Sequence, residues 1–277
     1  MNKFRVIQPS VLLAPYVKQY WLLTMENAVP GSQRLVPMGC VALSFHRGNR
    51  TYSSHEKGYL PRSYLYGIAG EYTDLAFSGR IDFICVIFQS TGAKAFFRMP
   101  LSELNNSYIP LDALSDRDLN ELEQKLLDTT DDSECIHLIE QFLFRRICQY
   151  DEYNSRRVDA VINSINSGET DIGQLAGTAC LGYKQFKRIF TESIGINPKN
   201  YLQIVRFQKL HHLFQQHVGM SVAQLAYECG YYDKSHLIKE LKSFSGFMPT
   251  ELLNACEPVY SDYHSLFRSA FIDLHPA

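Results

Sequence analysis

Eight side chains in two short segments of the chain are of types that contact nucleic acids. Arginine and lysine donate hydrogen bonds to guanine O6 and N7 or to phosphate oxygens, and an apolar side chain can touch the thymine methyl group. Helical spacing places the eight on the outward faces that remain once each segment buries its apolar stripe. The predicted DNA contacts are Tyr183, Lys184, Lys187 and Arg188 in the first segment and Lys234, Ser235, Ile238 and Lys239 in the second.

The eight residues differ in what they are expected to do. Arg188 is the best candidate for direct base readout, because its planar guanidinium suits bidentate pairing. Each lysine could equally contact a phosphate or remain solvated. Ile238 could touch a thymine methyl group or simply pack, and Glu240 is expected beside the contact face.

The two segments belong to an internal repeat. The tripeptide Gln-Leu-Ala at 174–176 recurs at 224–226, and the Gly-x-x-Pro sequence at 195–198 recurs at 246–249. The offset is 50 residues at the front and 51 at the back, so the second copy carries one extra residue in its central turn. A repeated unit of this length predicts two copies of one small supersecondary motif.

Each copy is predicted to form two short helices. Asp171 and Ser221 are good N-caps, and a glutamine three residues after each is typical of a capping box. The first helices run to Cys180 and Cys229, and Gly182 and Gly230 supply the turns. The second helices carry one-sided apolar stripes, Phe186, Ile189, Phe190 and Ile194 in copy one and Leu237, Leu241 and Phe244 in copy two. Such pairs, at about 171–195 and 221–246, are helix-turn-helix motifs, whose second helix enters the DNA major groove.

The segment between the copies predicts a long helix. Asn197 can cap it, Pro198 fits its first position, and an apolar stripe continues to Gln216 through Tyr201, Val205, Leu210, Leu213 and Phe214. About 19 residues at roughly 1.5 Å each give a rod of about 28 Å. Adjacent major-groove segments on one side of B-DNA lie about 34 Å apart. One chain could therefore place two recognition helices in neighbouring groove segments of an asymmetric site.

This pattern resembles the AraC/XylS family of bacterial transcription regulators over roughly 158–252. The shared features are a Leu-Ala pair opening each first helix, a central Gly-Tyr turn, an aromatic and basic recognition helix, and the Gly-x-x-Pro close. The resemblance implies a sequence-specific transcription regulator that binds double-stranded DNA and, if it activates, contacts RNA polymerase. Two departures are Gly182, where the family usually has a serine cap, and Leu241, where it usually has phenylalanine.

The first 150 residues predict a β-rich domain with a helical end. Val41, Leu43 and Phe45 alternate before a turn signal at Gly48-Asn49, and Ser78-Gly79 joins the segment 75–77 to 80–88. The stretch 81–88 is apolar on both faces, as in a strand covered on both sides. We expect a β-barrel or sandwich. It resembles the cupin-like N-terminal domain of some AraC-type regulators through residues 12–17 and 34–40, which implies effector sensing.

Two helices follow this β region. One has the stripe Leu119, Leu122 and Leu126, and the other has Ile136, Ile139, Leu143 and Ile147 with further apolar residues at Leu138, Phe142 and Phe144. The second must bury two faces, within its domain or in a homodimer, and we favour the dimer. The predicted organisation is an α+β chain with a regulatory domain at 1–150, a polar link at 150–156, an all-α DNA-binding domain at 157–252, and an extension at 253–277 in which Phe267, Phe271 and Leu274 suggest an amphipathic helix.

Charge and composition narrow the class of protein. The 277 residues have a net charge of −2 and are 45% hydrophobic and 20% charged, which favours two folded domains over a disordered chain. Neither half is basic, but Gly182 to Lys242 holds nine basic and four acidic side chains, a local +5. The apolar run 81–88 is too short for a membrane span. The N-terminus lacks a signal-peptide pattern, so a cytoplasmic protein is expected.

Metal, cofactor and catalytic signatures are weak in this sequence. Seven cysteines without a C-x-x-C pair favour reduced, buried thiols, and the histidines at 211, 212 and 217 have no cysteine at ligand spacing. His46 and His55-Glu56 do not match a cupin metal pattern, and no nucleophile elbow or phosphate-binding glycine loop occurs. We therefore predict no metal, no cofactor and no catalytic residues.

Two alternative functions remain open at this stage. The chain could be a regulator without an effector, whose N-terminal domain is a protein-contact scaffold. More remotely, it could be a small-molecule hydrolase or oxygenase with a DNA-binding tail. Arg34 could receive an anionic effector, although a structural salt bridge is the favoured role.

Overall fold

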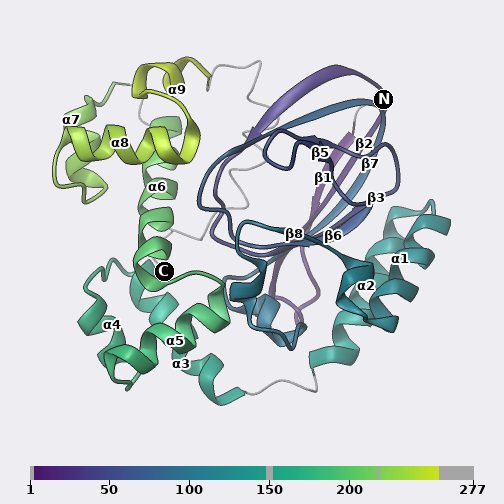
Figure 1. Cartoon of the computed structure of the whole chain (residues 1–277), viewed down its shortest axis with the longest axis horizontal. Helices are drawn as coiled ribbons and strands as arrows, with labels where there is room; N and C mark the ends of the chain where they lie inside the picture. The colour runs from purple at the N-terminus through teal and green to yellow at the C-terminus, as the bar shows by residue number, and fades with distance from the viewer. Residues whose placement is uncertain (1–2, 148–151, 217–218, 256–277) are drawn as a thin grey trace.

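The N-terminal half is one antiparallel sheet with strand order β1-β2-β7-β3-β6-β8, on which β4 and β5 form a side ribbon (Figure 1). The computed structural model describes residues 3–147, 152–216 and 219–255. The strands are β1 (Lys3–Ile7), β2 (Val17–Leu35), β3 (Ala42–His46), β4 (Tyr52–Ser53), β5 (Gly58–Tyr59), β6 (Ser63–Tyr66), β7 (Thr73–Phe88) and β8 (Tyr108–Pro110). Three 3-10 turns cover 92–95, 101–104 and 111–114. The predicted α+β class is confirmed.

Alternation along the strands gives the sheet two different faces. On β7, Ile84 and Val86 are fully buried in one core, whereas Cys85 and Ile87 belong to a second cluster on the opposite face. Helices α1 (Arg117–Asp128) and α2 (Asp132–Ile147) cover the first face, where the predicted stripe Leu119, Leu122 and Leu126 is buried. The second face carries no helix from this pair and lines a cavity.

Two predicted turns were wrong. Gly48-Asn49 does not close a hairpin: β3 pairs with β6 and β7, and the amides at 48 and 49 donate to carbonyls of β7 instead. Ser78-Gly79 does not separate two strands either. β7 runs through it as one bent strand, because Gly79 adopts a φ of +74° opposite a register shift in β2. Local turn signals cannot distinguish a bulge from a hairpin without the partner strand.

The C-terminal half is helical, as predicted. It contains α3 (Glu152–Asn166), α4 (Ile172–Thr178), α5 (Tyr183–Ile194), α6 (Pro198–Gln216), α7 (Val222–Glu228), α8 (Lys234–Ser245) and α9 (Pro249–Ala255). The helix predicted between the repeats has the bounds of α6. Residues 152–156 of the predicted polar link form the start of α3, where Ser155 is buried. The amphipathic helix predicted at 267–274 lies outside the described residues.

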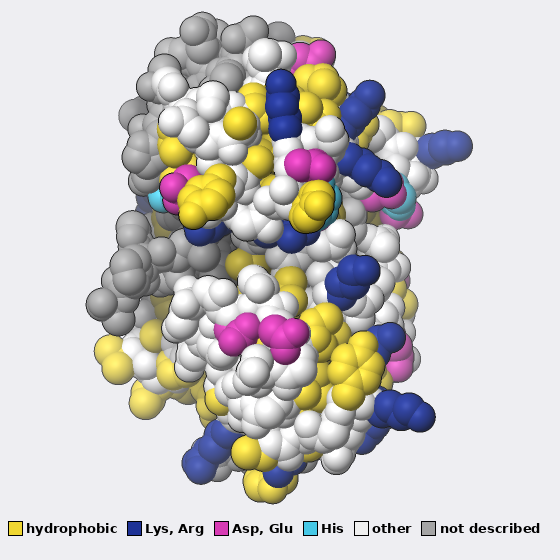
Figure 2. All heavy atoms as spheres, turned by 90° about the vertical axis from the view of Figure 1, so that its left-hand side faces the viewer, with side chains coloured by type: hydrophobic (Ala, Val, Ile, Leu, Met, Phe, Trp, Pro, Cys, Tyr) yellow, Lys and Arg dark blue, Asp and Glu magenta, His cyan; other side chains and the backbone are white. Residues whose placement is uncertain are grey.

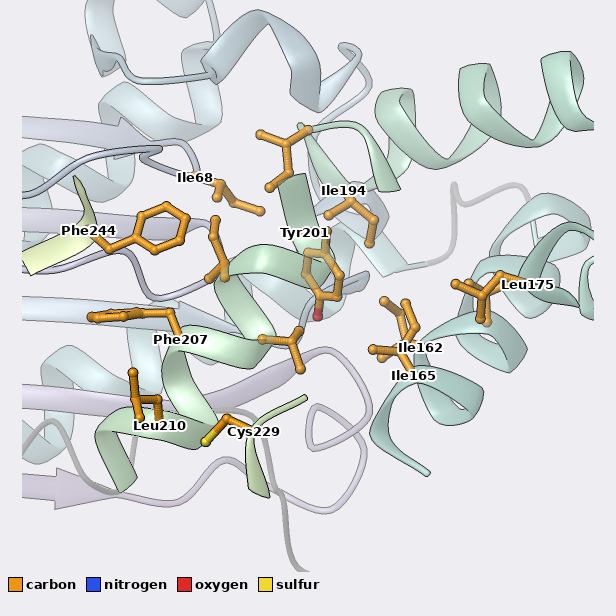
Figure 3. Close-up of a cluster of buried hydrophobic side chains, with 14 of the residues drawn as sticks. Ile68, Ile162, Ile165, Leu175, Ile194, Tyr201, Phe207, Leu210, Cys229 and Phe244 are labelled. Atoms are coloured by element: carbon orange, nitrogen blue, oxygen red, sulfur yellow. The ribbon is translucent and has the colours of Figure 1, made fainter. Parts of the chain in front are cut away.

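The two halves share a hydrophobic core. Helix α6 lies at its centre with Tyr201, Phe207 and Leu210 (Figure 3), and two residues of the β half, Val36 and Ile68, belong to the same cluster. Polar contacts cross the same boundary. The hydroxyl groups of Ser90 and Tyr201 lie 2.8 Å apart, and the hydroxyl of Thr91 donates to Asp159 at 2.5 Å. The helical half is therefore anchored to the sheet domain.

Candidate functional site

The first helix of each repeat begins at its predicted cap. Ser221 accepts from the backbone N–H of Gln224, whose side chain accepts from the N–H of Ser221, which completes a capping box. Asp171 accepts in the same way from Gln174 at 2.8 Å. Its own N–H donates to Glu169 at 2.7 Å, so the predicted box does not close in copy one.

The turn before each recognition helix has a left-handed residue, but not always glycine. In copy two it is Gly230, at φ +73°, as predicted. In copy one it is Cys180, at φ +52°, and the assignment of this turn to Gly182 was wrong. Gly182 is instead the N-cap of α5 and provides no side-chain cap, whereas Asp233 caps α8 by accepting from the N–H of His236 at 2.7 Å. The two recognition helices therefore begin differently.

The predicted contact residues of α5 all lie on its exposed face. Tyr183, Lys184, Lys187 and Arg188 are exposed, whereas the stripe Phe186, Ile189, Phe190 and Ile194 is buried. Arg188 pairs with Glu192 one turn along the helix at 3.1 Å. Within the described residues the three basic side chains form no other ion pair. They remain available to a ligand.

Helix α8 presents a smaller basic surface. Lys234, Ser235 and Lys239 are exposed, while Ile238 is half-buried and packs against the core of the C-terminal domain. Figure 2 shows Lys and Arg side chains projecting from both the upper part of this face, over α7 and α8, and the lower part, over α4 and α5. The geometry brings seven of the eight predicted residues to the surface and leaves Ile238 partly covered.

Glu240, which was expected beside the contact face, is buried and directed toward α6. It is 6% exposed and points from α8 to α6, where the guanidinium of Arg206 donates to its carboxylate at 3.0 and 2.5 Å. Gln203 donates to the same carboxylate at 3.3 Å, and the guanidinium of Arg206 lies over the Tyr231 ring, 4.6 Å from its centroid. This network fixes α8 to α6. The sequence analysis did not predict this network. The position of Glu240 beside the buried Leu237 and Leu241 on α8 could have indicated a buried acid with a partner.

A second contact ties α8 to the sheet domain through Arg34. Its guanidinium makes two hydrogen bonds to Asp74, at 2.7 and 2.8 Å, and donates to the carbonyl of Ser245 at 3.1 Å. The rings of Tyr72 and Phe247 lie 4.1 and 4.7 Å from it. The favoured structural role of Arg34 matches this geometry, and the contact also joins the two domains.

Replacing Arg34 with alanine is expected to lower the free energy of unfolding by about 1–2 kcal/mol, because charged hydrogen bonds and ring contacts are lost at a partly exposed site. Hydrogen exchange should become faster at the end of α8, near Ser245. The exposed Arg50, replaced in the same way, serves as the control. Equal exchange in both variants at Ser245 would mean that Arg34 does not hold the domains together.

The second face of the sheet contains a cavity of about 140 Å³. Its wall is rich in aromatic residues, including Trp21, Tyr64, Tyr66 and Phe83, and none of the described residues that line it is Asp, Glu, Lys or Arg. His46 projects into this wall from β3. Leu43 and Phe45 of the same strand face the opposite core. The positions that alternate with them, Ala42, Ser44 and His46, line the cavity.

Metal-binding geometry is not found in the described part of the chain: no three histidine, cysteine or acidic residues there are grouped to hold an ion. His46 is buried and His55 is exposed, and they form no such cluster. The cysteines at 40, 85, 135 and 229 are buried and free, while Cys180 is free but exposed, contrary to the general expectation of burial. No helix in the described ranges is long and apolar enough to cross a membrane.

Comparison with known proteins places two family models on the chain. A helix-turn-helix domain matches residues 175–255, and a domain of unknown function, DUF6597, matches residues 5–110. The helix-turn-helix domain predicted from the repeat is therefore confirmed.

The chain is also similar to individual known proteins, at low sequence identity or over part of their length. The chain is 31% identical over 117 residues to an uncharacterized HTH-type transcriptional regulator of Haemophilus influenzae, covering 42% of this chain and 39% of the relative. It is 24% identical over 159 residues to the probable transcriptional regulator LumQ of Photobacterium leiognathi, covering 54% and 64%. The chain thus spans less than two thirds of either relative. The solved structure of ToxT from Vibrio cholerae is 12% identical, with 91% and 98% coverage and a TM-score of 0.44.

Proposed function

We propose that this chain is a sequence-specific DNA-binding transcription regulator of the AraC family. The observation that carries the proposal is the duplicated motif itself, with basic residues exposed on both recognition helices. Lys184 and Lys234 lie at the N-terminal ends of α5 and α8, the end of a recognition helix that reaches base edges. The surrounding lysines would contact phosphates and orient the protein on the duplex.

Spacing supports simultaneous use of both helices. Helix α6 joins the two motifs, and its 19 residues correspond to a rod of about 28 Å. Figure 1 shows α5 and α8 near opposite ends of α6 on the same side of the molecule. Two adjacent major-groove segments of one site, about 34 Å apart, would suit this arrangement after modest bending or tilting.

The direct test is a gel shift of the full chain on the DNA upstream of its own gene. Replacing Arg188 and Lys239 together with alanine is expected to weaken binding by about thirtyfold or more, because each good base contact contributes roughly 1–3 kcal/mol. Binding should also weaken steeply with salt as counterions are released. Lys125, an exposed lysine of α1, provides the matched alanine control. Binding unchanged by the double replacement would contradict the assigned contact face.

The N-terminal domain is proposed to modulate DNA binding by accepting a small molecule in its cavity. Gln33 and Leu35 line this cavity, and Arg34 between them holds the end of α8 through Ser245. A ligand that moves this part of β2 would therefore act on the second recognition helix. Homodimerisation through α2 remains a prediction, as does contact with RNA polymerase.

The cavity and its connection to α8 favour a regulator with a small-molecule effector over a scaffold without one. Thermal-shift screening of metabolites distinguishes these two hypotheses. The full chain is used because the two domains share a hydrophobic core. A melting temperature insensitive to every metabolite, together with a stable dimer, would favour the scaffold.

A further inference from the structure

The residues that line the cavity in the N-terminal sheet differ in their burial. Leu23, Leu35, Leu75 and Phe77 are only partly buried, whereas Ala42, Ser44 and His46 of β3 are buried. A cavity of roughly 150 Å³ lined by apolar side chains can hold one benzene ring. At about 140 Å³, this cavity has room for a molecule of that size.

His46 supplies unused hydrogen-bonding capacity to this wall. The residue is 3% exposed, and neither ring nitrogen has a hydrogen-bond partner among the described residues. The ring packs against Phe83 and Tyr64, with centroids 4.9 and 5.8 Å away. Burial, and then the charges of Arg62 and Arg50, lower the pKa of His46 to about 4, so the imidazole is neutral near pH 7 and offers one donor and one acceptor.

The charge of the wall limits the ligand class. Because the described lining residues include no arginine or lysine, a carboxylate bound there would lose its hydration without gaining a counter-ion from them. A sugar would bring many hydroxyl groups to a wall that is mostly aromatic and aliphatic. A phenolic hydroxyl, in contrast, both donates and accepts one hydrogen bond, and its ring would pack against Trp21 and Phe83.

We propose that this cavity binds a neutral, single-ring aromatic molecule of the phenol class, with its hydroxyl group at His46 and its ring among Trp21, Tyr66 and Phe83. The inference rests on the proposed function, in which this molecule is the effector. Gln33, whose buried amide nitrogen also has no partner in the part of the chain that the structure describes, lies in the wall next to Arg34 and provides a second polar contact for a substituted ring.

The chain contains its own reporter for this binding. Trp21 is its single tryptophan and lines the cavity, so its fluorescence senses an added ring directly. Three probes of similar size are titrated into the full chain with excitation at the red edge of tryptophan absorption: p-cresol, toluene and benzoate. We expect saturable changes with p-cresol, about tenfold weaker binding of toluene, which leaves His46 unpaired, and no saturation with benzoate.

Variants assign the effect to His46. Replacing His46 with phenylalanine keeps a ring of similar shape and is expected to abolish the preference for p-cresol over toluene while toluene still binds. Replacing Ala42 with leucine fills the cavity and should remove both signals. Tyr227, an exposed tyrosine of α7, gives the control as Tyr227→Phe. Each variant is first checked for a native circular dichroism spectrum, and toluene binding independently reports an intact cavity in His46→Phe.

Three results would overturn the proposal: non-saturable quenching by all probes, tighter binding of benzoate than of p-cresol, or an unchanged p-cresol preference in His46→Phe. None of these measurements involves DNA. Absence of a gel shift together with normal p-cresol binding would reject only the regulatory function. A normal gel shift without p-cresol binding would reject only the ligand site.

Discussion

Replacing Glu240 with alanine is expected to lower the free energy of unfolding by about 3 kcal/mol. The carboxylate is nearly fully buried and accepts both hydrogen bonds from Arg206, so its removal leaves a largely buried guanidinium without its counter-ion. The side chain of Arg206 is 25% exposed, which keeps the loss at the lower end of the range for buried pairs. Chemical denaturation of the full chain measures it.

The other recognition helix provides the matched control. Arg188 and Glu192 on α5 also form an ion pair, but both side chains are exposed, and Glu192→Ala is expected to cost about 0.5 kcal/mol or less. Glu240→Gln keeps the shape and one acceptor, so its loss should be intermediate. Similar losses for Glu240→Ala and Glu192→Ala would show that the buried network does not fix α8 to α6.

Acidification is expected to destabilise the protein by about 3 kcal/mol through His46 alone. Burial lowers the pKa of this residue from 6.5 to about 4, so between these values the unfolded chain binds a proton that the folded chain does not. The contribution to stability is therefore complete above pH 6.5 and is lost as the pH falls toward 4. Denaturation midpoints measured across this window give the slope.

The comparison of His46→Phe with the parent chain isolates this contribution, since carboxylates titrate in both proteins. On acidification from pH 6.5 toward 4, His46→Phe should lose about 3 kcal/mol less of its free energy of unfolding than the parent chain. A parent slope retained in His46→Phe would mean that the imidazole is protonated in the folded protein.

Helical periodicity predicted the C-terminal domain well. The bounds of α6, the two N-caps and the buried stripes of α5 and α8 all follow from local spacing, because each depends on residues within a few turns of one another. The exposure of Lys184 and Arg188 follows from the same stripes. What they contact in DNA remains a prediction.

Long-range pairing explains what the sequence could not show. Whether Gly79 bends one strand or joins two depends on β2, fifty residues away along the chain, and the direction of Glu240 depends on Arg206 of another helix. The residues that line the cavity could not be assigned from the sequence for the same reason. Its wall combines β2, β3, β6 and β7, and only their register places His46 beside Phe83.

Val36 and Ile68, which the β half inserts into the helical core, have a consequence for hybrid regulators. A fusion that grafts residues from 152 onward onto an unrelated sensory half would omit these two side chains and leave part of that core open to water. A working hybrid would have to transfer the loops around residues 36 and 68 with the helices. When domains are exchanged between such proteins, the boundary of the helical domain in the sequence therefore differs from the boundary of its hydrophobic core.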